Sequence, residues 1–322
     1  MPETPQTPGT TIASLGESAL IRSIKGWLGQ ANPPSPFGIS DDCAVIPGDL
    51  KGLLVTVDPV IRGRHFDDAL PPRLVAEKLL KRNLSDIAAM GGVPTKAVIA
   101  LSAPPDLPVA WLRAFYVALG KSACRHHVQI VGGDCTQSDG FLGAFLTLLG
   151  KPGKRVLTRD GAKAGDVLFV TDNLEGSLLD HHARFTPRLD EGAWLVKQPA
   201  VRAAIDLSDG LGKDLFSLLS PGLRAVIRTD ALPASRDARR AARIDGRSVT
   251  DHVLNDGEDF ELLFAASAKR ANALEAAWKS MFDTPLTRIG RLVAAEDDQV
   301  AVVTFDPPLP PDVHVHGYEH FR

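Results

Sequence analysis

Apolar positions along the chain follow two spacings that alternate. Short apolar runs rich in β-branched residues are typical of strands, and apolar residues three or four positions apart are typical of helices. In the first half, such runs predict strands at residues 43–46, 53–57, 95–102, 128–131 and 141–149. The helical spacing predicts helices at residues 14–28, 73–90 and 109–124. We therefore expect a mixed sheet covered by helices in this half.

The second half repeats the alternation after a break in composition. Gly, Lys and Pro dominate residues 150–166 and apolar periodicity is lost there, which is typical of a domain boundary. Strands are predicted at residues 167–171, 203–207, 224–229, 261–265 and 300–305. Helices are predicted at residues 210–219, 235–243 and 267–281. The interpretation is an α/β (mixed α+β) protein with a flexible proline-rich tail at residues 1–12 and two domains at residues 13–150 and 151–322.

Composition and charge exclude several classes of protein. The 322 residues are 44% apolar and carry 36 basic and 39 acidic side chains, so a net charge of −3 gives no basic field for nucleic acid. The longest apolar run, residues 141–149, is far shorter than the roughly 20 residues that span a bilayer. Cys43, Cys124 and Cys135 form no Cys-x-x-Cys pair, which favours reduced thiols and a cytoplasmic protein.

Acidic residues recur in turns beside glycine and other small residues. A single such Asp is more often a helix cap or turn residue than a ligand, but recurrence favours a shared role. Mg²⁺ prefers oxygen ligands and takes one or two carboxylates together with substrate phosphates. The pattern therefore indicates several Mg²⁺ ions that hold a polyphosphate. The five sites are residues 40–43, 57–59, 84–87, 132–134 and 205–210.

Two of these segments carry a more specific signal. Asn83, Ser85 and Asp86 interrupt an otherwise apolar helix face, and a buried carboxylate there needs a cation, so we interpret Asp86 as a metal ligand. The Gly132-Gly133-Asp134 turn follows a predicted strand and could bring backbone N–H groups to phosphate, although this signal is weak by itself. Neither a P-loop nor a Gly-x-Gly-x-x-Gly fingerprint occurs.

A further acidic segment, residues 255–261, runs directly into a predicted strand. Gly257 permits a tight turn that could aim Glu258 into a pocket. A solvated acidic loop explains the same residues equally well, so both interpretations stay open.

The motifs together resemble the thiamine-monophosphate kinase family, over residues 16–321. That family shares a superfamily with aminoimidazole ribonucleotide synthetase, selenophosphate synthetase and a hydrogenase-maturation protein. The resemblance implies a two-domain aminoimidazole ribonucleotide synthetase-like fold, with an N-terminal mixed sheet with helices, a C-terminal α/β sandwich, and a homodimer in which the N-terminal sheets pair. The matching motifs are residues 38–44, 83–91, 132–136, 157–163, 205–211, 257–262 and 317–321.

The resemblance also implies roles for individual residues. The terminal phosphate of ATP would pass directly to thiamine monophosphate, with several Mg²⁺ ions and no phosphoenzyme. Metal-ligand positions are Asp42, Thr56, Val57 through its main chain, Asp58, Asp86, Asp134, Asp206 and Asp209. ATP-contact positions are Gly133, Asp134, Arg159 and Ser208, and acceptor positions are His65, Glu258 and Val315. Asp86, Asp134 and Arg159 would carry catalysis, since phosphoryl transfer needs positioning and neutralisation of charge. His65 could instead be a surface residue beside Arg64.

Departures from the family pattern fall on the acceptor side. Val315 stands where the family has an aromatic residue, and stacking would need Tyr318 or Phe321 instead. The segment after Asn173 is shorter than usual. We therefore keep two alternatives: an ATP-dependent enzyme of the same superfamily that acts on a different phosphorylated or carboxylated acceptor, and a nucleotide-binding homologue without activity. If the pocket is otherwise retained, Val315→Trp should tighten binding of thiamine monophosphate.

Overall fold

The computed structural model describes most of the chain from Asp41 onward. The described residues are 41–46, 52–174, 181–295 and 302–319, with Ala19, Arg22, Pro34 and Ser35. The predicted tail lies outside them, and so does the predicted helix at residues 14–28 apart from Ala19 and Arg22. None of the helices in the described part of the chain has the length and apolar character needed to span a membrane.

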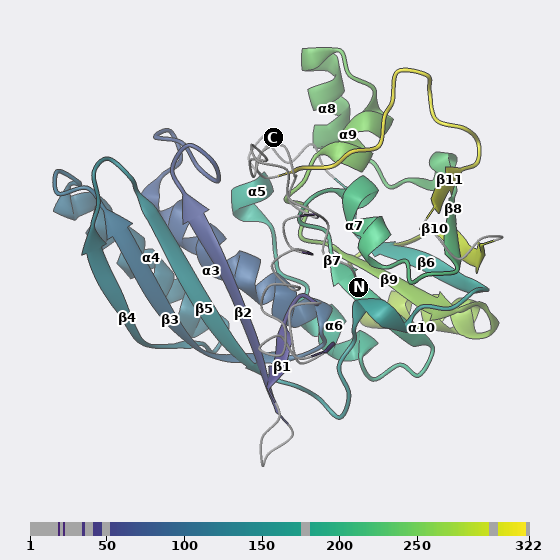
Figure 1. The fold of residues 1–322 in the computed structure, drawn as a ribbon, viewed down its shortest axis with the longest axis horizontal. Helices are drawn as coiled ribbons and strands as arrows, with labels where there is room; N and C mark the ends of the chain where they lie inside the picture. The colour runs from purple at the N-terminus through teal and green to yellow at the C-terminus, as the bar shows by residue number, and fades with distance from the viewer. Residues whose placement is uncertain are drawn as a thin grey trace, which may run out of the picture.

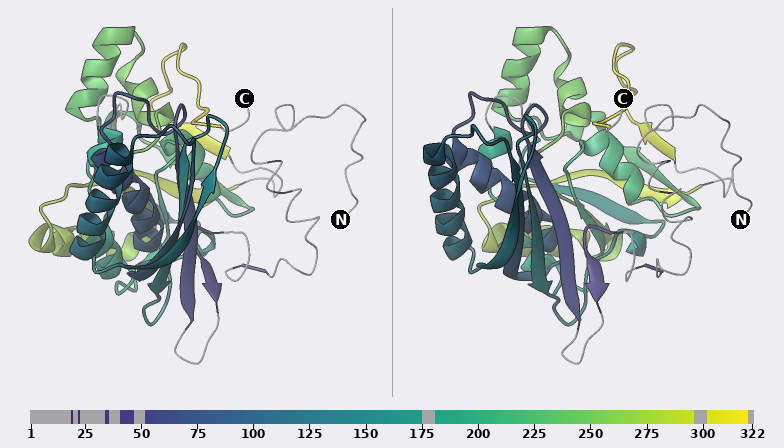
Figure 2. Two further views of the ribbon diagram at one scale, coloured as in Figure 1. Left: turned by 90° about the vertical axis from the view of Figure 1, so that its left-hand side faces the viewer. Right: turned by 60° about the vertical axis from the view of Figure 1, so that its left-hand side comes forward.

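The first half of the chain forms a five-stranded sheet in the order β1-β2-β5-β3-β4 (Figure 1). All neighbours are antiparallel except β3 and β4, which are parallel. Helices α3 (Pro72–Ala89) and α4 (Val109–Arg125) pack on one face of this sheet (Figure 2). The strands are β1 (Ala44–Ile46), β2 (Leu53–Ile61), β3 (Val93–Ala103), β4 (Gln129–Gln137) and β5 (Gly143–Lys151).

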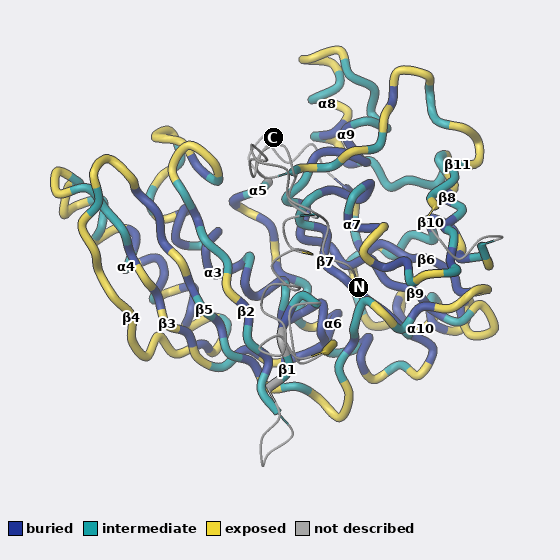
Figure 3. Tube along the Cα trace, viewed as in Figure 1, coloured by how far each residue is buried: buried dark blue, intermediate teal, exposed yellow. Residues whose placement is uncertain are grey.

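No helix in the described part of the chain covers the other face of the first sheet, which is called the open face below. Successive residues of a strand point to opposite faces, so Thr56 and Leu146 are buried under the helices while Val57 and Phe145 are exposed. Val98 on β3 is exposed on the same open face, and every residue of β4 is exposed (Figure 3). A monomer rarely leaves such an apolar face uncovered.

The second half forms a six-stranded sheet in the order β11-β8-β10-β6-β9-β7. One apolar core joins its strands to α7 (Leu211–Ser217) and α9 (Val249–Asn255), and another joins them to α6 (Leu189–Leu195) and α10 (Ala271–Met281). Leu168 and Phe169 of β6 belong to different cores, so helices cover both faces of this sheet. The strands are β6 (Asp166–Thr171), β7 (Val201–Asp206), β8 (Leu223–Ile227), β9 (Leu262–Ser267), β10 (Leu286–Ala294) and β11 (Val302–Phe305).

The mixed α/β class is confirmed, and most predicted elements are present within a few residues. The periodicity missed β10, whose run is broken by Arg288, Gly290 and Arg291, although it lies inside the sheet between β6 and β8. It also missed α6, α9 and the short α5 (His181–Arg184). The helix predicted at residues 235–243 is α8 (Arg236–Asp245). The division into two domains stays a prediction.

Gly133 corrects one local prediction. Residues 132–134 were expected to form a turn after a strand, but they lie inside β4, which stays paired with β3 through Gln137. A Cβ at Gly133 would lie 1.9 Å from the carbonyl oxygen of Ile99, so the two strands approach too closely for any side chain.

Helix α3 is the element that both halves share. It is buried along most of its length, and α4, β2 and β5 of the first half and α6 and β7 of the second half contact it (Figure 1). Its polar residues therefore meet side chains from both halves.

Replacing Gly192 by Ala tests the close packing of α6 on α3. The added Cβ would lie 2.0 Å from the carbonyl oxygen of Ala88, so a backbone has to move. We expect chemical denaturation to show a free energy of unfolding lowered by about 1–3 kcal/mol. The matched control is Gly120→Ala in α4, where no neighbouring atom lies within 4 Å and stability should rise by up to about 1 kcal/mol. Equal effects of the two substitutions would contradict this packing.

Candidate functional site

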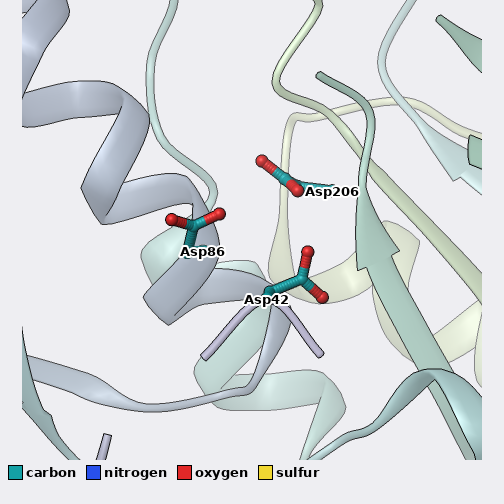
Figure 4. Close-up of side chains that lie close together, drawn as sticks. All are labelled: Asp42, Asp86 and Asp206. Atoms are coloured by element: carbon teal, nitrogen blue, oxygen red, sulfur yellow. The ribbon is translucent and has the colours of Figure 1, made fainter. Parts of the chain in front are cut away.

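Three carboxylates from distant parts of the chain meet between the two sheets. Asp42 precedes β1, Asp86 lies in the last turn of α3, and Asp206 ends β7. One oxygen atom from each lies within 4.8 Å of the others (Figure 4). Asp42, Asp86 and Asp206 are called the carboxylate trio below.

Neighbouring polar groups hold each member of the trio in place. The Thr56 hydroxyl donates to Oδ2 of Asp86, and the Ser85 hydroxyl donates to Oδ2 of Asp206 at 2.7 Å. Nη2 of Arg159 donates to Oδ1 of Asp42 at 2.7 Å. Arg159 begins a short 3₁₀ turn, and its backbone N–H donates to the side chain of Asp41 at 2.9 Å.

The electrostatics of the trio favour a cation. Burial raises the pKa of Asp86 well above its usual range, and Asp58 and Asp206 raise it further. Burial likewise raises the pKa of Asp206, and Asp42 adds to the effect. Burial raises the pKa of the nearby Cys43 thiol, which therefore stays neutral and adds no thiolate ligand. The donors of the site are then the carboxylate oxygens of the trio. Such a donor set suits a hard divalent ion such as Mg²⁺, which would relieve the repulsion.

Asp58 lies on β2 beside the trio, although it is not a member of it. The backbone N–H of Asp58 donates to Oδ1 of Asn83 at 3.0 Å, and its Oδ1 accepts from Nη2 of Arg82 at 3.3 Å. The Val57 side chain points to the open face and is 60% exposed, so Val57 could reach a metal only through its main chain. Asp209 also lies outside the trio, where its Oδ2 accepts from Nζ of Lys213 at 2.8 Å.

Gly133 and Asp134 lie away from the trio within one chain. Asp134 pairs with Ala100 of β3, and Ala100 pairs with the exposed Phe145 of β5. Asp134 therefore belongs to the open face, whereas Thr56 lies on the face covered by α3. A single chain does not bring Asp134 to the other predicted metal ligands.

A cavity of about 400 Å³ is lined by Asp209 and by Arg82, the partner of Asp58. Its walls come from the turn after β2, from α3, and from four segments of the second half. The lining residues are Arg64, His65, Arg82, Ser208, Asp209, Arg247, Asn255, Asp256, Gly257, Glu258, His316, Gly317 and Tyr318.

Glu258 is held in this cavity by its backbone conformation and by two ion pairs. Its backbone has φ 68°, a left-handed conformation that costs free energy for a residue with a side chain. Its Oε2 lies 2.8 Å from Nζ of Lys78, and its Oε1 lies 3.4 Å from Nη1 of Arg82. This geometry favours the aimed side chain over the solvated acidic loop.

Lys78 ties two segments of the cavity wall to helix α5. Besides Glu258, its Nζ contacts the carbonyl oxygen of His65 at 2.7 Å and Nδ1 of His182 at 2.8 Å. Burial lowers the pKa of Lys78 to about 8, although Glu258 opposes this shift. The His65 ring is fixed as well, since its Nδ1 accepts from the backbone N–H of Ile61 at 3.1 Å.

Val315, predicted at the acceptor, does not line this cavity. It packs on the core of the second sheet, and its Cγ1 would lie 2.7 Å from a Cβ at Gly212. It borders a separate cavity with Lys213 and Phe216. Tyr318 supplies the only Phe, Tyr or Trp ring among the described residues that line the main cavity.

Sequence reasoning missed Lys78 and Arg82 as site residues. A signal was present, because Lys78, Arg82 and Asp86 are four residues apart and so share one face of α3. Two cations and a carboxylate along one side of an apolar helix indicate a common polar environment.

The chain is similar to known proteins along nearly all of its length. The family described as AIR synthase related protein, N-terminal domain, matches residues 40–151. Thiamine-monophosphate kinase of Rhodopirellula baltica is 34% identical and covers 94% of this chain and 97% of its own length. The enzyme of the same name from Aquifex aeolicus is 30% identical and covers 88% and 94%.

Solved structures agree with these sequence matches. The structure of AaThiL complexed with AMPPCP and TMP superposes with a TM-score of 0.82 and 29% identity, over 98% of this chain and 100% of that one. It confirms the aminoimidazole ribonucleotide synthetase-like fold implied by the motifs. On sequence and fold together, the chain belongs to the thiamine-monophosphate kinase family.

Proposed function

We propose that this protein transfers the terminal phosphate of ATP to the phosphate of thiamine monophosphate and so forms thiamine diphosphate. The observation that carries the proposal is the carboxylate trio beside a cavity that Glu258, His65 and Arg82 line. The family assignment and the relative bound to AMPPCP and TMP support the choice of both substrates.

The trio and its neighbours would hold Mg²⁺ for this reaction. Asp42, Asp86 and Asp206 supply a compact set of oxygen donors. Asp209 lines the cavity, and Asp58 pairs with Arg82 of the cavity wall. Bound Mg²⁺ would neutralise the phosphate oxygens and align the donor with the acceptor.

Other residues of the chain would bind the donor and orient the acceptor. Arg159 and Ser208 would contact ATP. His65 and Glu258 would orient the acceptor, with Lys78 fixing both. The acceptor phosphate is already ionised, so its oxygen attacks without a strong general base, and the bond from the γ-phosphorus to ADP breaks as the new bond forms.

Two chains would pair through the open face of the first sheet. Val57, Val98 and Phe145 make that face apolar, and this supports a homodimer. Gly133 and Asp134 belong to the exposed strand β4, so their predicted part in ATP and metal binding depends on this pairing. The three unpaired cysteines support a cytoplasmic protein.

Asp86→Asn tests the proposed activity at its metal centre. Purified wild type with Mg-ATP and thiamine monophosphate should release ADP and thiamine diphosphate in equal amounts. The substitution should lower kcat by about a hundredfold or more, because one metal ligand is lost. Its unfolding temperature without Mg²⁺ should not fall, since a buried, repelled charge is removed.

The control for this experiment is Asp106→Asn, at an exposed position far from the trio. It should leave kcat unchanged. Wild-type release of ADP with a different acceptor would support the alternative substrate, and ATP binding without turnover would support the non-catalytic alternative. Full activity in the Asp86 variant would remove that residue from the metal site.

Tyr318→Ala tests which ring contacts the acceptor. The Tyr318 backbone N–H donates to the carbonyl oxygen of Asp209 at 2.8 Å, and this bond sets the ring position in the cavity. We expect KM for thiamine monophosphate to rise about tenfold with kcat nearly unchanged, and Tyr318→Phe to resemble wild type. Val315→Trp should not tighten binding, because Val315 lies outside the cavity. Tighter binding in that variant, with no effect at Tyr318, would reverse the assignment.

Phe145→Glu tests the pairing of chains. Light scattering coupled to size exclusion should give wild type twice the mass of one chain and the variant the mass of one chain, because a charge would be buried at the interface. Ile244→Glu on α8 is the control, since it also adds a charge at an exposed apolar position but away from the sheet. A variant at Phe145 that stays dimeric would exclude this face.

A further inference from the structure

Arg82 lies between the two parts of the site. It is one helical turn from Asp86 of the trio and one turn from Lys78, which holds Glu258. Its guanidinium pairs with Asp58 on one side and with Glu258 on the other, and it lines the cavity. Arg82 thus pairs with both a predicted metal ligand and a predicted acceptor residue.

The contacts of Arg82 leave part of its hydrogen-bonding capacity unused. The two ion pairs are 3.3 and 3.4 Å long, whereas strong charge-assisted bonds are about 2.7–2.9 Å. Its Nε is buried and has no hydrogen-bond partner among the described residues. The Arg82 side chain is only 11% exposed, and buried donors are normally hydrogen-bonded. A bound ligand could supply the missing acceptor.

The two carboxylates beside Arg82 are secured by other groups. Glu258 is held by Lys78 at 2.8 Å, and the backbone of Asp58 is held by Asn83. The guanidinium also lies 5.9 Å from the centre of the Phe260 ring, which supports its flat face. The Phe260 ring and the two carboxylates therefore fix the position of the guanidinium. A phosphate oxygen could replace Asp58 or Glu258 as the acceptor of its long hydrogen bonds.

We propose that Arg82 binds phosphate in this reaction and contacts the group that passes from ATP to thiamine monophosphate. The inference rests on the proposed function. As the bond from the γ-phosphorus to ADP breaks and the bond to the acceptor oxygen forms, negative charge is shared by oxygens of both phosphates. The fixed guanidinium donates to these oxygens and reduces the repulsion between donor and acceptor, and no proton is transferred.

The kinetic experiment compares Arg82→Gln and Arg82→Lys with wild type in the full-length protein. The Gln variant should lower kcat by about a hundredfold, because a charged donor to the transferred group is lost. The Lys variant should keep an intermediate activity, because a point charge replaces the planar fork. Millimolar guanidinium should partly restore kcat in Arg82→Ala, which a purely structural role of Arg82 would not allow.

The matched control is Arg188→Gln. Arg188 is also 11% exposed and pairs with Glu261 and Asp172, both at 2.6 Å, but it lies outside the cavity. This variant should lose stability and keep wild-type kcat below its unfolding temperature. A similar loss of kcat in both variants at equal folded fractions would overturn the proposal, because the effect would then be structural.

A binding measurement separates this proposal from the proposed function. Calorimetry in metal-free buffer uses thiamine monophosphate and inorganic pyrophosphate as probes. Arg82→Gln should weaken binding of both by about tenfold or more. If wild type forms thiamine diphosphate and the variant keeps wild-type kcat and affinities, only the role of Arg82 fails. If wild type forms none, the proposed function fails, and weaker pyrophosphate binding by the variant still identifies Arg82 as a phosphate-binding residue.

Discussion

The site depends on holding like charges together away from water. One oxygen atom from each of Asp42, Asp86 and Asp206 lies within 4.8 Å of the others, and burial raises the pKa of Asp86 and Asp206 well above the usual range. Two hydroxyl groups and Arg159 offset part of this repulsion. The packing of the two sheets around α3 has to offset the remaining repulsion. Because a bound cation would remove this repulsion, the trio favours cation binding.

Helix α3 places the charged groups of the site in a fixed order along one axis. Asp86 lies at one end of its polar face, Lys78 lies two turns away beside Glu258, and Arg82 lies between them. A rigid helix thus sets the separation between the carboxylate trio and the cavity. The left-handed backbone at Glu258 adds a second fixed point, since that conformation persists only where the surroundings enforce it.

Much of the fold was predictable because the periodicity is local. The apolar spacing of α3 and the runs of β2, β3, β5, β6 and β9 each express a preference within a few residues. β10 was missed because Arg288 and Gly290 break its run, and its place in the sheet comes from pairing with β6 and β8. The Gly132-Gly133-Asp134 segment was predicted as a turn because glycine is typical of turns. Pairing with β3 makes it a strand, and the close approach of Ile99 leaves no room for a side chain at Gly133.

The sequence by itself determined which residues could carry the chemistry: acidic turns, a buried Asp on an apolar helix, and motifs in the order of one family. Only the tertiary structure decided which of them meet. Asp42 and Asp206 are far apart along the chain, Asp134 lies on the open face of its sheet, and Tyr318 rather than Val315 enters the cavity. The reason is physical, since residue type and spacing act over a turn or a strand, whereas distance across a site is set by register and by packing between remote segments.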